Sequence, residues 1–187
     1  MESAEPRRHR FTADQVLAMV EAGILAQDAR VELLHGELIE MSPQGPAHRG
    51  LTVHLRHLLE QRFGEGYHVQ DHSPVAVGQD SLPEPDVAVV RGAIDFTHHP
   101  TGAQVVLVVE ISATSHREDR AKVELYGAAG IPECWLVDVP RRRLLVYRDP
   151  RPELGGYAVC VVAGEGDSVG VAGAEVPVGA LLPPALG

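Results

Sequence analysis

Two acidic residues, Asp86 and Glu110, lie at the ends of segments whose apolar residues predict core strands. Asp86 comes directly before Val87–Val90, and Glu110 follows the apolar run Val105–Val109. A carboxylate at the margin of a buried strand is costly unless it is solvated, paired or bound to a metal. If the two strands are neighbours, the two carboxylates meet at one end of the sheet. The alternative is that each is an acid at a strand end that faces water.

Lys122 is the only lysine of the chain, in which fifteen of the sixteen basic residues are arginine. Helical spacing places it beside Glu118, Leu125 and Tyr126, at the edge of an apolar stripe where its stem is buried and its ammonium emerges. One interpretation is a surface ion pair with Glu118, worth about 0.3–0.5 kcal/mol. Arginine would make that pair equally well. A catalytic role explains the lysine better, because an ammonium is a compact charge whose pKa can shift.

A third carboxylate is available in a predicted hairpin near the N-terminus. Glu37 lies beside the turn and shares a strand face with Ile39 and Met41, because side chains alternate between the two faces of a strand. We therefore take Glu37 as the candidate third acid of the site. Glu32, on the facing strand, is the substitute candidate. The alternative for Glu37 is a simple acid at the end of a turn.

The elements that must position these residues follow from apolar spacing, caps and breakers. Helices are predicted over 12–21, over 47–63 and from a Ser115–Glu118 capping box to the stop at Gly130. Strands are predicted over 31–34, 37–41, 67–70, 74–77, 87–90, 104–111, 135–138 and 144–148, with edge strands and loops after Tyr157. The pattern indicates an α/β or α+β fold: a mixed sheet flanked by helices, with an N-terminal helix and β-hairpin. We expect a flexible arm over 1–11 and one domain over 12–187 with a β-rich C-terminal tail.

Composition excludes several classes of protein. With 187 residues, 44% hydrophobic and 22% charged, the chain is long enough for a sizeable core and is not expected to be disordered. The apolar run Val105–Val109 is far too short to cross a bilayer, so no membrane association is expected. Cys134 and Cys160 each lie in an apolar stretch, so we expect both to be buried thiols of a cytoplasmic protein. The net charge of −10 argues against a simple nucleic-acid coat protein, but it permits an enzyme whose carboxylates hold a metal.

Two further groups of residues could bind ligands. The ten histidines are scattered, and their spacing to carboxylates matches no zinc motif. The basic turn Arg141-Arg142-Arg143 is the best candidate for contacts with phosphate. The alternative for this turn is a solvated hairpin tip.

An ordered set of motifs resembles the Uma-type family of restriction-endonuclease-like proteins, which belongs to the PD-(D/E)XK nuclease superfamily. The resemblance covers roughly residues 13 to 150, and the set is specific although each motif alone is weak. Its parts are Arg30–Leu38, Met41-Ser42-Pro43 with His48, Pro85-Asp86-Val87, Val108–Ser112, Asp119–Lys122 and Gly130–Asp138.

The resemblance implies a nuclease core with the element order αβββαβ and assigns the site residues. The Pro-Asp motif falls on Asp86, and the acid of (D/E)XK falls on Glu110. The lysine of that motif is replaced by Ser112, a departure that family members share, and Lys122 on the following helix is at the position proposed to supply the ammonium. The early acid of the family corresponds to Glu37. The loop 112–115 lacks the proline that the family often has there.

Phosphodiester hydrolysis requires an activated water and a charge that stabilises the phosphate. Mg²⁺, or Mn²⁺ in its place, prefers oxygen ligands, which Asp86, Glu110 and the backbone carbonyl of Ile111 would supply. Lys122 would then orient the water, act as the general base or stabilise the charge of the transition state.

Two functions follow from these observations. The first is a Mg²⁺-dependent endonuclease that hydrolyses DNA. The second is a catalytically inactive module on the same fold, acting in binding or assembly within a mobile-element or defence system, and it is favoured by Ser112 and the acidic net charge. The glycine-rich tail and apolar hairpins leave room for a homodimer.

Overall fold

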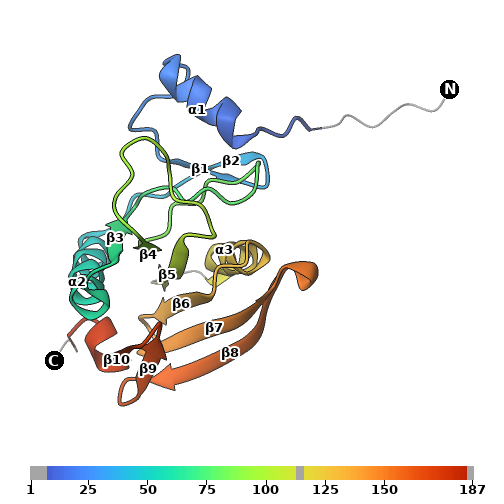
Figure 1. The fold of residues 1–187 in the computed structure, drawn as a ribbon. Coiled ribbons are helices and arrows are strands. Elements are labelled where there is room, and N and C mark those ends of the chain that lie inside the picture. Colours follow the sequence, from blue (N-terminus) through green and yellow to red (C-terminus); the bar gives the residue numbers. More distant parts are fainter. Residues whose placement is uncertain (1–7, 113–115, 185–187) are drawn as a thin grey trace.

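The structure is a computed structural model that describes residues 8–112 and 116–184. A six-stranded mixed sheet forms the centre, with helices packed against it and two small hairpins at its ends (Figure 1). The sheet contains β3 (Tyr67–Asp71), β4 (Val87–Arg91), β5 (Val105–Ser112), β6 (Glu133–Asp138), β7 (Arg143–Arg151) and β8 (Gly156–Gly164), in that spatial order. The fold is therefore mixed α/β, as the apolar pattern predicts.

The N-terminal helix and hairpin form as expected. Helix α1 (Ala13–Glu21) begins at Thr12, whose hydroxyl accepts from the N–H of Gln15 while the Gln15 side chain accepts from the N–H of Thr12. Strands β1 (Val31–Leu34) and β2 (Glu37–Glu40) pair antiparallel. The turn between them is His35-Gly36, in which both residues have positive φ, the geometry of a tight hairpin turn.

Helix α2 (Pro46–Phe63) covers one face of the sheet. Its residues Leu51, Leu55 and Leu59 are buried at helical spacing and join a core with side chains of β4 and β5. The helix ends at Gly64, which has positive φ. The predicted helix over 47–63 is confirmed.

The central strand β5 is buried along its whole length. It pairs antiparallel with β4 and parallel with β6, and α3 (His116–Ala128) forms the crossover that the parallel pair requires. Helix α3 covers the face opposite α2, where Val123 and Tyr126 pack against a second core. The order α2-β3-β4-β5-α3-β6 is the αβββαβ order that the family resemblance implies.

Helix α3 approaches the sheet closely. A Cβ placed on Gly127 would lie 2.4 Å from the backbone of Gly156, so only glycine permits this contact. The helix ends before Gly130, which has positive φ, as predicted. The predicted capping box of Ser115 and Glu118 lies outside the residues whose side chains the structure describes.

Two predictions differ from the structure, those for residues 74–77 and for Cys160, whereas the predicted edge strands after Tyr157 are confirmed. Residues 74–77 form only isolated bridges, because Pro74 has no N–H for a ladder and Val75 and Val77 fill a core instead. The C-terminal tail contributes a complete strand, β8, to the main sheet, followed by the hairpin β9 (Ser168–Val171) and β10 (Ala174–Pro177). Cys134 is buried, but Cys160, on that edge strand, is exposed. None of the helices in the described part of the chain could span a membrane.

Candidate active site

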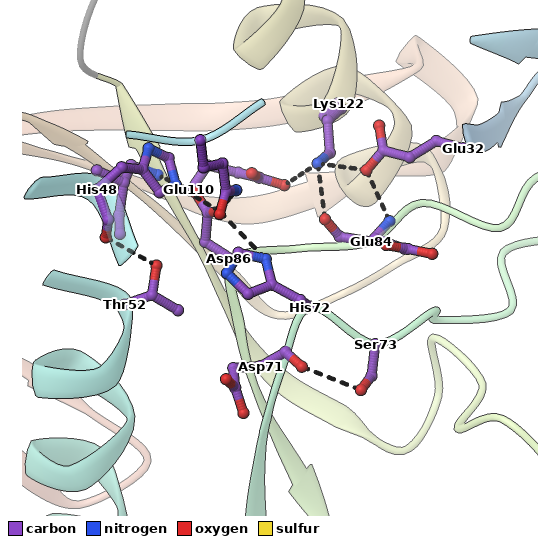
Figure 2. Close-up of polar contacts among 12 residues, drawn as sticks. Glu32, His48, Thr52, Asp71, His72, Ser73, Glu84, Asp86, Glu110 and Lys122 are labelled. Carbon is purple, nitrogen blue, oxygen red and sulfur yellow. Dashed lines mark hydrogen bonds and ion pairs between the residues drawn. The ribbon is translucent and has the colours of Figure 1, made fainter. Parts of the chain in front are cut away.

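Four elements bring charged side chains to one place. Strand β1 supplies Glu32, the start of β4 supplies Asp86, the end of β5 supplies Glu110 and α3 supplies Lys122 (Figure 2). Each of these four residues is buried. The pairing of Val87 with Val109 explains part of the convergence, since Asp86 and Glu110 each lie one residue beyond that pair, at the same end of the sheet. We call these four residues the acid–lysine cluster.

Lys122 is at the centre of the cluster. Its Nζ lies 2.8 Å from Glu32 Oε1 and 2.8 Å from Glu110 Oε1, and it donates to the carbonyl oxygen of Glu84 at 3.0 Å. An ammonium has three protons, and these three acceptors match them. Glu32 Oε1 also accepts from the N–H of Glu84 at 2.8 Å, which links the β1 hairpin to the segment before β4.

The cluster contains more negative than positive charge, because three carboxylates surround one ammonium. Complete burial raises the pKa of Glu110 to about 8, helped by Asp86 and Glu32 and opposed by Lys122. Burial alone would lower the pKa of Lys122, but the carboxylates of Glu110 and Glu32 outweigh it and raise that pKa. At neutral pH the lysine is therefore charged, and the surplus negative charge favours a proton on Glu110 or a bound cation.

Asp86 is held by hydrogen bonds on both oxygens. Its Oδ1 accepts from His48 Nε2 at 2.7 Å and from Gln44 Nε2 at 3.1 Å, and its Oδ2 accepts from the N–H of Ile111 at 2.7 Å. Burial alone would raise the pKa of Asp86, but His48 and the Ile111 N–H hold it below its ordinary value. Asp86 is therefore an ionised carboxylate with a fixed orientation.

A second histidine adjoins Asp86. His72 Nδ1 lies 3.7 Å from Asp86 Oδ1, and its ring stacks on that of His48 with the ring centroids 6.4 Å apart. Burial lowers the pKa of His72. Its Nε2 is buried and has no hydrogen-bond partner among the described residues. Both imidazoles thus lie beside a carboxylate of the cluster.

Next to the cluster is a cavity of about 560 Å³ between the β1–β2 hairpin, the loop before α2 and helix α3. Its lining includes all four residues of the cluster, and the remainder comprises Leu34, Ile39, Glu40, Met41, Ser42, Pro43, Gln44, Gly45, His48, Glu84, Ile111 and Ala121. The carboxylates and the ammonium are therefore accessible from one hollow.

The structure does not bring Glu37 to the cluster. Its side chain is about half exposed and lies 3.9 Å from Arg8 and from Arg10. Its pairing partner is Leu34, beside the turn, whereas the cluster lies further along the hairpin at the pair of Glu32 and Ile39. Glu32, the substitute candidate, occupies the place that the sequence assigned to Glu37. The two acids share a face of the hairpin, so the prediction for Glu37 differs from the structure only in the position along the strand.

The arginines of the 141–143 turn already pair with acids. Arg142 binds Glu165 through Nε at 2.7 Å, and Arg143 Nε lies 2.8 Å from Asp138 Oδ2, with Arg141 Nη1 at 3.4 Å from the same oxygen. Asp138 pairs with Ser112 at the end of β5, so this turn lies at the same end of the sheet as Glu110. Its position suits a phosphate contact, but its charge is partly neutralised.

The predicted ligands suit a hard divalent cation in type. Asp86 and Glu110 offer carboxylate oxygens at the ends of adjacent strands. Ile111 follows Glu110 directly and donates its backbone N–H to Asp86. No three His, Cys, Asp or Glu side chains in 8–112 and 116–184 are preorganised as a metal site. Lys122 contacts both Glu32 and Glu110, and Asp86 and Glu110 are the carboxylates that would hold a cation.

Three further residues adjoin the acid–lysine cluster but are not among the site residues that the sequence predicts. His48 and His72 adjoin Asp86, and the hydroxyl of Tyr126 donates to Glu110 Oε1 at 2.7 Å. Tyr126 follows Lys122 by four residues on α3, so helical spacing places both on one face. His48 lies within the motif set that carries the family resemblance. His72 has no signal in the sequence.

A family model matches most of the chain. The model of Uma2, described as a putative restriction endonuclease, matches residues 13–176. The chain belongs to the Uma2 family. This match confirms the resemblance and extends it beyond residue 150, so that β8 and β9 also lie within the Uma2 region.

A solved structure shows the same fold. The crystal structure of a putative nuclease belonging to DUF820 from Anabaena variabilis ATCC 29413 is 18% identical in sequence to this Uma2 chain, with a TM-score of 0.70. The match covers 91% of this chain and 97% of that one. At this identity the likeness concerns the fold alone. No curated protein matches the chain.

Proposed function

We propose that the chain is an endonuclease that hydrolyses phosphodiester bonds of DNA with Mg²⁺, or Mn²⁺ in its place. The observation that carries the proposal is the position of Lys122, whose Nζ joins Glu110 and Glu32 at the margin of a cavity that Asp86 also lines. The Uma2 match and the nuclease-like fold support a nuclease. The charge surplus of the cluster supports a cation.

Asp86 and Glu110 would hold the cation, together with the carbonyl of Ile111. When bound, the cation would polarise the phosphate and acidify a water molecule. His48, Gln44 and the Ile111 N–H fix the orientation of Asp86, which keeps a carboxylate ready for this task.

Lys122 would stabilise the negative charge of the phosphate in the transition state by its own positive charge, since Glu32, Glu110 and the carbonyl of Glu84 already accept its three protons. Its carboxylate neighbours raise its pKa, so the ammonium keeps its proton at neutral pH and acts as a charge stabiliser, not as a general base. Glu32 and the carbonyl of Glu84 hold the ammonium in place from the other side. An ammonium is a compact point charge, whereas a guanidinium is a planar fork of five donors, so the two do not substitute freely for one another.

The test is cleavage of single-stranded, double-stranded and branched DNA by the purified chain in Mg²⁺, in Mn²⁺ and in a chelator. We expect cleavage that requires the metal and is lost in Glu110→Gln, with thermal unfolding used to verify the fold of each variant. Intact DNA of all three forms across both metal titrations would contradict the proposal.

The alternative is a catalytically inactive binding or assembly module on the same fold. The pairing of Arg142 with Glu165 and of Arg143 with Asp138 favours it, because it leaves less free positive charge for DNA. Calorimetry with Mn²⁺ separates the two functions. A nuclease binds Mn²⁺ in a way that depends on Asp86 and Glu110, whereas an inactive module has no need of that site.

A further inference from the structure

Strand β8 (Gly156–Gly164) lies at one margin of the main sheet (Figure 1). One of its edges pairs with β7 over nearly its full length. In the part of the chain that the structure describes, no strand pairs with the other edge. That edge therefore presents a row of backbone N–H and C=O groups able to bind a further strand.

The side chains of β8 are apolar and exposed. Val159, Val161 and Val162 are 41%, 46% and 55% exposed, and Cys160 between them is also exposed. Val161 lies opposite Val146 and Val162 opposite Leu145, so these neighbours point to opposite faces of the sheet. Apolar side chains thus flank the open edge on both faces.

Protective features of edge strands are missing from β8. Edge strands of monomeric proteins are usually short, bulged or marked by charged residues and proline. Gly156–Gly164 spans nine residues without a charged side chain or a proline, in a chain of which 22% is charged. The opposite edge strand, β3, has five residues, includes His68, Gln70 and Asp71, and packs against α2. Of the two edge strands of the main sheet, β8 is therefore the one suited to pairing with a further strand.

A second copy of this chain fits that edge. Each copy has a net charge of −10, so two copies repel one another except where an uncharged surface lets them approach. Two β8 strands related by a two-fold axis run antiparallel. All nine uncharged residues overlap when the axis passes by Cys160, the middle residue, and Val159 of one copy then faces Val161 of the other.

We propose that the chain forms a homodimer in which β8 of one copy pairs antiparallel with β8 of the other, with the two-fold axis at Cys160. The two six-stranded sheets become continuous, and exposed valines of the two copies lie side by side across the new strand pair. This proposal is independent of the nuclease activity proposed above, because β8 contributes no residue to the acid–lysine cluster or to its cavity.

The first test is the mass in solution, measured by light scattering over a concentration series. We expect twice the 20.1 kDa of one chain for the wild type. Val161→Lys places charges on both sides of the axis and should give the monomer mass with an unchanged circular dichroism spectrum. Val53→Lys is the matched control, because Val53 is an exposed valine, 58% exposed, on α2, and this variant should remain dimeric.

The second test uses the two thiols. Directly opposed residues of an antiparallel pair have Cα atoms about 4.5–5.5 Å apart, within the range of about 4.4–6.8 Å that a disulfide accepts. Oxidation by copper phenanthroline, which removes two electrons and two protons from two thiols, should link Cys160 of both copies. Cys134→Ser should still cross-link, because Cys134 is buried, and Cys160→Ser should not.

A wild type that has the monomer mass throughout the series would overturn the proposal. A dimer that survives Val161→Lys would also overturn it, because its interface would lie elsewhere.

Discussion

Lys122 Nζ lies 2.8 Å from Oε1 of Glu110, although the two residues come from different elements on either side of the loop that follows β5. The contact exists because α3 crosses back over the sheet between two parallel strands, β5 and β6, and so returns over the end of β5. Under the proposed function, Lys122 would take the role of the lysine that the (D/E)XK motif lacks at Ser112. This relationship leads to predictions for each side of the contact.

Lys122→Met should abolish most of the activity. The loss of a charged donor at the transition state corresponds to about 10²–10³-fold in the rate of DNA cleavage. The same change leaves buried carboxylates without their cation, a destabilisation of about 3–5 kcal/mol. Rates under single turnover and urea unfolding measure the two effects. Lys122→Arg keeps the charge but should also lose activity, and an Arg variant of full activity would show that a compact ammonium is not required.

Glu32→Gln and Glu37→Gln form a matched pair on the same face of one hairpin. Glu32 holds Lys122 and the backbone of Glu84, so its replacement should misplace the ammonium and slow cleavage about 10–100-fold. Glu37 contacts Arg8 and Arg10 at the surface, so its replacement should leave the rate unchanged. Cleavage rates of both variants in Mg²⁺ provide the test. Equal losses in both would contradict the position of Glu32 in the site.

Much of the fold is predictable from local signals. The Thr12 cap, the His35-Gly36 turn and the stop at Gly64 mark the ends of elements by residue type alone, and the structure confirms all three. The run Val105–Val109 predicts a strand buried on both faces, which β5 is. These signals act within a few residues, so they do not depend on the rest of the chain.

The predictions that differ from the structure concern residues whose surroundings depend on contacts between distant parts of the chain. Alternation along β2 placed Glu37 on the correct face, but the way the hairpin docks on α3 and on the segment before β4 selected Glu32. His72 reaches Asp86 only through the tertiary fold. The apolar stretch around Cys160 predicts burial, whereas Cys160 lies exposed on β8 at the edge of the main sheet.

The stability of the metal-free protein should fall as the pH rises from about 4.5 to about 8. The pKa of Glu110 is about 8 in the folded chain and 4.5 in the unfolded chain. A raised pKa of this kind stabilises the fold fully below pH 4.5, and the stabilisation is lost as the pH rises to about 8. The slope is at most about 1.4 kcal/mol per pH unit.

The comparison with Glu110→Gln isolates this contribution. The groups facing Glu110 are Lys122, Asp86, Glu32 and Tyr126, and Lys122 keeps its charge throughout the range. The lowered pKa of His72 acts in the opposite direction below about pH 6.5, where the unfolded chain binds a proton more readily than the folded one, and this contribution is the same in both proteins. Chemical unfolding of both proteins at several pH values is the measurement. A slope that is the same in the variant would assign the effect to another group.

His48→Ala should weaken metal binding about 10–100-fold, because the loss of a partner that orients a ligand typically has an effect of this size. His48 Nε2 donates to Asp86 Oδ1 at 2.7 Å and helps to keep the pKa of Asp86 low. Titration calorimetry with Mn²⁺ measures the change. His57→Ala is the control, since His57 lies exposed on the same helix and contacts Gln61. Equal affinities in both variants would remove His48 from the site.

The most direct measurement is the rate at which a defined DNA duplex is cleaved in Mg²⁺ by the wild type, Asp86→Asn and Glu37→Gln, each verified as folded. Asp86 lies within the acid–lysine cluster and Glu37 outside it. We predict cleavage by the wild type and Glu37→Gln at the same rate and none by Asp86→Asn. Cleavage by Asp86→Asn at the wild-type rate would contradict the assignment of the active site.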